Sequence, residues 1–163
     1  MELMPKILII DDDREWCKKL GTPLTDEGLQ VTSESNRSEA TNLLRSKHFD
    51  LVVLNVCLTH EETDDKVIRQ WIDLLELIKQ QRAKVIIVTS QSFSPNIGLQ
   101  GLTRTAFRDY KAVDFLTKED FDSGVYHQDV LEGILDSQQT HIIGHREYKL
   151  HGVNLEIFHF LMH

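Results

Sequence analysis

Several residue types are scarce in this sequence, and each shortage excludes a class of protein. Two cysteines among 163 residues exclude a fold held by several disulfides. Both Cys17 and Cys57 lie in or beside apolar patterns, as buried or half-buried thiols in a reducing compartment do. Only 18 Lys and Arg stand against 26 Asp and Glu, for a net charge of -8. This balance argues against binding to nucleic acid, because phosphate backbones need clustered cations.

The sequence also lacks targeting and membrane signals. The start, MELMPK, is no signal peptide, because a charged strand pattern follows it at once. No apolar run approaches the roughly 20 residues that a membrane helix needs. We therefore expect a soluble, cytoplasmic protein. The length suits one domain with a little left over, and we expect a domain over residues 1–139 and a C-terminal extension over 140–163.

Short apolar runs alternate with helical patterns along the first 139 residues. Strands are predicted over residues 7–10, 29–32, 51–54, 85–88 and 112–116. Helices are predicted after the first strand and over residues 36–47, 67–78, 96–110 and 129–137. Pro23 is expected to kink or shorten the first helix, and Gly28 to end it. This alternation predicts an α/β fold with a parallel sheet covered on both faces.

Polar residues follow four of the predicted strands. They are Asp11-Asp12-Asp13, Asn55, Thr89-Ser90 and Thr117-Lys118. In an open parallel sheet the carboxyl ends of the strands lie at one edge, and ligands bind there at the switch in strand order. The sequence therefore predicts one polar site built from four strands.

Four segments carry a resemblance to a known family: KILIIDDD, FDLVVLN, VIIVTS and DFLTK. Together they resemble the receiver domain of two-component response regulators, over about residues 6–139. The resemblance implies a flavodoxin-like (βα)5 three-layer sandwich with strand order 2-1-3-4-5. It also implies the roles of the site residues. Asp11 and Asp12 would be the acidic metal-binding pair, and Asn55 stands at the phospho-acceptor position. Thr89 would be the switch hydroxyl, Phe115 the switch aromatic and Lys118 the pocket lysine.

The phospho-acceptor position departs from the family pattern, which has an aspartate where this chain has Asn55. A carboxylate is a usable nucleophile toward phosphorus and a ligand for hard cations, whereas a neutral amide is poor at both. Thr59 and Glu119 also replace prolines that the family usually has. A cis Lys118–Glu119 bond would cost roughly 3–4 kcal/mol. We expect either a trans bond with Lys118 aimed differently, or a strained cis bond.

The loss of the acceptor charge changes the expected electrostatics of the site. Asp11 and Asp12 retain at best a weak Mg²⁺ site, and no cofactor is required. Lys118 is expected to pair with Asp11 or Asp12 as a permanent internal countercharge. Simpler roles stay open: a solvated turn for Asp11 to Asp13, a strand cap for Thr89, a surface position for Lys118 and a core position for Phe115. The acidic loop over residues 59–65 is expected to be solvated.

The favoured function is a pseudo-receiver, a non-enzymatic signalling module that binds a protein partner without phosphorylation. The resemblance implies that the contacts lie on a face built from residues 96–110, 112–116 and 120–137. One alternative is a receiver that phosphate or metal still regulates through Asp11, Asp12 or Asp13. Another is a phosphatase similar to the haloacid dehalogenases, with Asp11 as nucleophile and Asp13 as general acid. Glu15 and the lack of room for a cap disfavour it.

The residues from 140 to 163 are extra to the receiver pattern. They hold five of the eight histidines, at spacings that match no tight zinc site: His141, His145, His151, His159 and His163. Apolar residues in this segment fit either a strand or a helix, and a hairpin near Gly144 or Gly152 stays open. Because the segment needs cover, a homodimer or the start of an effector domain is possible.

Overall fold

The computed structural model describes residues 4–57, 65–90 and 97–142 of the chain. Strands and helices alternate throughout. The strands are β1 (Lys6–Ile10), β2 (Gln30–Glu34), β3 (Leu51–Asn55), β4 (Lys84–Thr89) and β5 (Asp114–Thr117). The helices are α1 (Arg14–Asp26), α2 (Arg37–Ser46), α3 (Asp65–Gln80), α4 (Ile97–Asp109) and α5 (Ser123–Ile142). Each predicted strand and helix is present, with bounds that differ at some ends.

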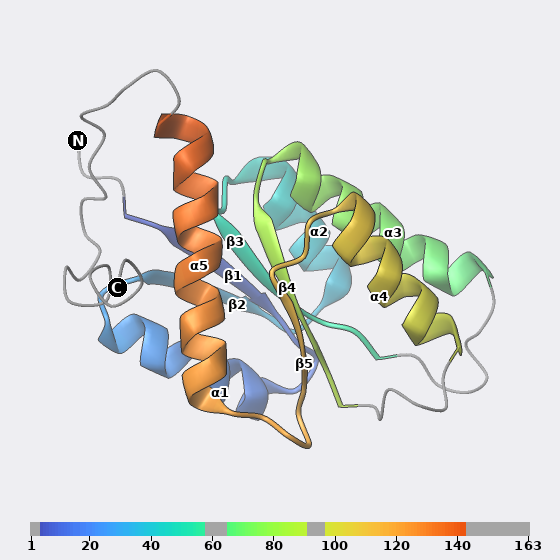
Figure 1. Cartoon of the computed structure of the whole chain (residues 1–163), viewed down its shortest axis with the longest axis horizontal. Helices are drawn as coiled ribbons and strands as arrows, with labels where there is room; N and C mark the ends of the chain where they lie inside the picture. The colour runs from blue at the N-terminus through green and yellow to red at the C-terminus, as the bar shows by residue number, and fades with distance from the viewer. Residues whose placement is uncertain (1–3, 58–64, 91–96, 143–163) are drawn as a thin grey trace.

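The five strands form one parallel sheet in the order β2-β1-β3-β4-β5. Helices α1 and α5 cover one face, and α2, α3 and α4 cover the other (Figure 1). The chain adds β2 on one side of β1 and then continues with β3 on the other side. The order therefore switches between β1 and β3, and the predicted flavodoxin-like three-layer fold is confirmed.

Apolar residues on both faces of the inner strands explain this layering. Side chains alternate along a strand, so β1 sends Ile7 and Ile9 to one face and Leu8 and Ile10 to the other. The first pair joins the hydrophobic cluster under α1 and α5, and the second joins the cluster under α2, α3 and α4. Every residue of β3 is buried. This is the burial expected of a parallel sheet that is covered twice.

Capping residues set several helix ends as the sequence predicts. The Asn36 side chain accepts a hydrogen bond from the Glu39 amide at 3.1 Å and opens α2. Gly28 has a φ of 87°, which favours glycine, and its amide donates to the Thr25 carbonyl after α1. Of the two effects predicted for Pro23, shortening of α1 is wrong, because the helix continues through Pro23 to Asp26, and a kink stays a prediction.

Helix α5 differs most from its prediction. It begins at Ser123, where a helix near residues 129–137 was expected, and it runs to Ile142. The missed start has a local cause: the Asp122 carboxylate accepts from the Gly124 amide at 2.8 Å and so caps the first turn. The helix crosses the expected domain boundary at residue 139. Residues 143–163 lie outside the described residues, so the part of the expected extension beyond α5 and a homodimer stay predictions.

Across residues 4–57, 65–90 and 97–142, no helix has both the length and the apolar character needed to cross a membrane.

Candidate functional site

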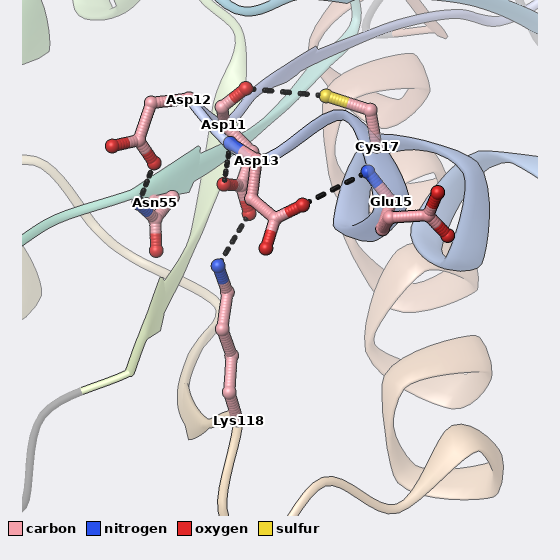
Figure 2. Close-up of polar contacts among 7 residues, drawn as sticks. All are labelled: Asp11, Asp12, Asp13, Glu15, Cys17, Asn55 and Lys118. Carbon is pink, nitrogen blue, oxygen red and sulfur yellow. Dashed lines mark hydrogen bonds and ion pairs between the residues drawn. The ribbon is translucent and has the colours of Figure 1, made fainter.

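The polar residues predicted to share a site come together at the carboxyl edge of the sheet. Asp11 and Asp12 follow β1, Asn55 ends β3, and Lys118 follows β5. Figure 2 shows the Lys118 side chain reaching toward Asp11, with Asn55 beside Asp12. The group lies at the switch in strand order between β1 and β3, as the fold predicts.

Asp11 is the buried centre of the site, with 1% of its surface exposed. One carboxylate oxygen, Oδ1, accepts from the Asp13 amide at 2.9 Å, and Oδ2 lies 2.8 Å from Lys118 Nζ. The Cys17 thiol donates to the Asp11 carbonyl at 3.3 Å. Burial raises the pKa of Asp11, and the hydrogen bond from Lys118 opposes that rise. Asp11 is thus a desolvated carboxylate with one cationic partner.

Lys118 is held at both its backbone and its side chain. Its amide donates to the Thr89 carbonyl at 2.7 Å, which places it beside the end of β4. Its ammonium group, besides the ion pair with Asp11, lies 5.0 Å from the centre of the Trp16 ring. The side chain is only 9% exposed. The surface-lysine interpretation is therefore wrong, and of the two expected partners, Asp11 and Asp12, Lys118 pairs with Asp11.

The Lys118–Glu119 peptide bond was expected to be either trans or strained cis. Among the described residues none of the peptide bonds is cis, so Lys118–Glu119 is trans. The trans bond still lets Lys118 reach the acidic pair, because its amide is hydrogen-bonded to β4.

Asn55 lies against Asp12. The amide Nδ2 donates to Asp12 Oδ1 over 3.4 Å, a long hydrogen bond. Asn55 is 6% exposed, and its Oδ1 accepts no hydrogen bond from the described part of the chain. In Figure 2 this oxygen points away from Asp12. The side chain therefore contributes one donor to the acidic pair and one buried acceptor to the pocket.

Asp13 has a local structural role. Its carboxylate accepts from the Glu15 amide at 2.9 Å and caps the start of α1. The three aspartates therefore have different contacts: Asp11 binds Lys118, Asp12 accepts a hydrogen bond from Asn55, and Asp13 caps helix α1.

The two predicted switch residues, Thr89 and Phe115, lie on the strands next to the site. Thr89 ends β4 and is fully buried, and its carbonyl accepts a hydrogen bond from the Lys118 amide. Phe115 is partly buried on β5 and packs against the hydrophobic cluster under α2, α3 and α4. The core position proposed for Phe115 describes this packing.

A pocket of about 500 Å³ opens at the carboxyl edge of the sheet, beside Asn55 and Lys118. Its lining consists of Asp12, Asp13, Arg14, Trp16, Asn55, Cys57, Ser90 and Lys118. Sequence reasoning had assigned Trp16 only to the helix pattern. Its position in the first turn after the acidic run was the available signal, because that turn faces the strand ends. Lys19 Nζ also lies 4.2 Å from the Trp16 ring centre, so two lysines contact this indole.

The site has few ligands for a metal ion. Oxygen atoms suited to Mg²⁺ are present on Asp12 and on Asn55, whose Oδ1 is buried. Asp11 Oδ2 is engaged by Lys118. In the part of the chain that the structure describes, no three His, Cys, Asp or Glu side chains are placed to hold a metal together. The acidic loop residues 58–64 lie outside that part.

Comparisons with known proteins agree on one family. A family model described as response regulator receiver domain matches residues 7–125. None of the curated protein sequences compared with the chain matches it.

Solved structures with this fold cover most of the chain. A CheY-like receiver domain protein from Methanospirillum hungatei JF-1 is 18% identical, with a TM-score of 0.64, over 85% of this chain and 99% of that chain. The receiver domain of a putative LuxO repressor protein from Vibrio parahaemolyticus is 18% identical, with a TM-score of 0.65, over 86% of this chain and 98% of that chain. The non-phosphorylated HemR receiver domain from Leptospira biflexa is 26% identical, with a TM-score of 0.58, over 80% of this chain and 94% of that chain.

Proposed function

Because this chain belongs to the response regulator receiver domain family, we propose that it is a pseudo-receiver. In this proposal Asn55 occupies the position of the phosphorylatable aspartate, and the module signals by binding a protein partner without being phosphorylated. It has no catalytic turnover of its own and acts in the cytoplasm, in keeping with its two free cysteines.

The observation that carries the proposal is the position of the Asn55 amide. It lies within hydrogen-bonding reach of Asp12 and in the same pocket as Lys118. An amide at this point supplies no anionic nucleophile and takes one negative charge away from a cation site.

The contacts of Lys118 further support a fixed state. In phosphoryl transfer a lysine can stabilise charge on the transferred group. Here Lys118 Nζ is already paired with the buried Asp11 carboxylate and lies over Trp16. Breaking this pair would leave Asp11 as an uncompensated buried charge. Lys118 therefore stabilises the folded pocket without any phosphate.

A magnesium ion fits this site only weakly. Asp12 would hold it, with backbone or water oxygens completing the shell, because Asn55 turns its Nδ2 atom toward Asp12. When bound, the ion would supply charge neutralisation near Asp12. The proposal requires no cofactor.

The expected partner face is formed by α4, β5 and α5. Two large apolar side chains on these helices are exposed: Phe107 on α4 and Val125 on α5, each 42% exposed. Apolar groups on a surface are common, but exposed aromatic side chains are frequent anchors in protein interfaces. We propose that a protein partner contacts this face.

Intact-mass measurement after incubation with acetyl phosphate and Mg²⁺ tests the chemistry. We expect the wild type to gain no phosphoryl group and Asn55→Asp to gain one, because the variant regains a carboxylate beside Asp12. Asn55→Ala serves as a control that removes the amide without adding an acid. A labelled wild type would contradict the proposal. Mapping that label to Asp12 or Asp13 would support the alternative of a receiver with a displaced acceptor.

Partner binding needs a separate test. Proteins retained by the immobilised wild type should be retained equally with and without acetyl phosphate. Phe107→Ser should lose them, whereas Asp73→Asn, an exposed change on α3, should keep them. Binding that appears only after phosphorylation of Asn55→Asp would show a conventional receiver surface and contradict the proposal.

A further inference from the structure

Strand β2 forms an open edge of the sheet. It pairs with β1, and no other described strand lies on its far side. Its residues Gln30, Thr32 and Ser33 are exposed, whereas β3 is buried along its whole length. An open strand presents backbone N–H and C=O groups with which a further strand can pair. We call the outer side of β2 the β2 edge.

The pairing with β1 shows which backbone groups of β2 face outward. The Gln30 amide and the Glu34 carbonyl form hydrogen bonds of 3.2 Å and 3.1 Å with the residues that flank β1. In a parallel strand the two backbone groups of one residue lie on the same side, and the side alternates along the strand. The even-numbered residues of β2 therefore face β1. The backbone groups of Val31 and Ser33 consequently face the β2 edge.

The strand lacks the features that usually protect an open edge. Natural proteins place lysine, proline or a bulge on such strands. Strand β2 has neither lysine nor proline, and its register with β1 is continuous from Gln30 to Glu34. Its single charged side chain, Glu34, stands at the end and accepts a hydrogen bond from the Asn36 amide at 3.1 Å. The middle of β2 can therefore accept another strand without burying a charge.

A second copy of β2, running antiparallel, is complementary to the β2 edge. With Thr32 opposite Thr32 of the second copy, Val31 lies opposite Ser33 and Gln30 lies opposite Glu34. Each of the two symmetric pairs of Val31 and Ser33 then exchanges both of its backbone hydrogen bonds. No like charges lie opposite each other, and Gln30 can donate to Glu34. This self-complementarity is what a two-fold interface between identical chains requires.

Helix α1 adds complementary charges to the same arrangement. It runs opposite to β2, so its first turns lie beside the end of that strand. There Arg14 and Lys18 line a groove of about 500 Å³ together with Ser35. The last residue of α1 is Asp26, beside the start of β2. Reversing one copy about an axis perpendicular to the sheet brings Arg14 and Lys18 level with Asp26 of the second copy, and all three side chains are exposed.

We propose that two copies of this chain associate through the β2 edge, with antiparallel β2 strands and Thr32 at the two-fold axis. The net charge of -8 on each copy opposes association. Charges more than about 8 Å apart are largely screened at physiological ionic strength, so the nearby opposite charges on α1 dominate. Strand β5 lies at the other edge of each sheet, outside this contact. The inference is independent of the proposed function.

Amide hydrogen exchange at two protein concentrations tests the pairing. The amides of Val31 and Ser33 should gain at least about tenfold protection as the concentration rises from about 10 μM to about 1 mM. The amides of Thr32 and Glu34 should change less than about twofold, because they already face β1. No gain at Val31 and Ser33 would overturn the inference. If both amides are strongly protected at each concentration, another segment of the same chain covers the edge, which also overturns it.

A cysteine introduced at the two-fold axis tests the register. Facing residues of a non-hydrogen-bonded pair have Cα atoms about 4.5 Å apart, which a disulfide can span. Oxidised Thr32→Cys should therefore form a covalent dimer joined through position 32. Gln30→Cys should form little, because residue 30 lies opposite residue 34. The wild type, with Cys17 and Cys57, gives the background. Equal cross-linking of the two variants would contradict the register.

Sedimentation equilibrium of two Ser33 variants completes the test. Ser33→Pro removes one outward amide and leaves the hydrogen bonds to β1, and proline is tolerated on an edge strand where the N–H faces outward. It should stay monomeric where the wild type and Ser33→Ala are dimeric, with circular dichroism confirming that it folds. Dimers of Ser33→Pro as stable as those of the wild type would refute the proposal. A wild type that is monomeric at about 1 mM would do so even if Ser33→Pro fails to fold.

Discussion

Replacing Lys118 by methionine should strongly destabilise the fold. The change removes the cation 2.8 Å from Asp11 while keeping an unbranched side chain of similar length. Asp11 has 1% of its surface exposed and would be left as a buried carboxylate without its countercharge. Removing one partner of such a pair costs about 3–5 kcal/mol. A domain of this size has a stability of about 5–15 kcal/mol, so the loss is a large fraction.

The penalty should depend on pH in a defined direction. Burial already raises the pKa of Asp11, and Lys118 opposes that rise, so the pKa rises further in Lys118→Met. A carboxyl group with a raised folded-state pKa loses stability as pH increases above its unfolded value of about 4. The penalty should therefore be larger near pH 8 than near pH 5, where protonation of Asp11 removes the unpaired charge.

Urea unfolding followed by far-ultraviolet circular dichroism measures these differences. Lys19→Met is the matched control, because Lys19 also lies over Trp16 but the change leaves the Asp11–Lys118 pair intact. It should cost less than about 1 kcal/mol. The double variant Asp11→Asn/Lys118→Met should recover most of the loss, since neither charge remains. A Lys118→Met stability within about 1 kcal/mol of wild type would refute the argument, as would an equal penalty in the Asp11→Asn background.

Three further changes test other parts of the structure. Tyr126→Phe should lose about 1 kcal/mol in urea unfolding, because the buried hydroxyl donates to the Leu20 carbonyl at 2.8 Å, and no loss would contradict this role. Asn36→Ala should lose about 1 kcal/mol through the α2 cap, whereas Asn36→Asp should lose much less. Cys17 should react with a thiol reagent more slowly than Cys57, because burial raises the pKa of the Cys17 thiol, and equal rates would count against that burial.

The sequence was informative where a local pattern has one structural solution. The apolar run at Leu51 to Leu54 has no polar face, so it predicts a strand inside a doubly covered sheet, and β3 is such a strand. Asn36 followed by Glu39 predicts a helix start, and α2 begins there. The helix start at Ser123 was missed, because its first two turns contain few apolar residues and the cap at Asp122 is a weak signal on its own.

The sequence could also predict which residues share the site, though not how they are paired. Parallel strands bring their carboxyl ends to one edge, so the neighbourhood of Asp11, Asn55 and Lys118 follows from their positions in the chain. The choice of Asp11 over Asp12 as the partner of Lys118 was left open. It depends on which carboxylate points into the protein after the strand ends.

By itself, the sequence determined the strand and helix pattern, the parallel sheet and the presence of an amide where the family has an acid. Only the tertiary structure decided that Lys118 pairs with the buried Asp11 and that Trp16 lies beside the ammonium group of Lys118. The physical reason is the range of each cause. Propensity and periodicity act between neighbours in the chain, whereas desolvation and charge pairing depend on groups that only folding brings together.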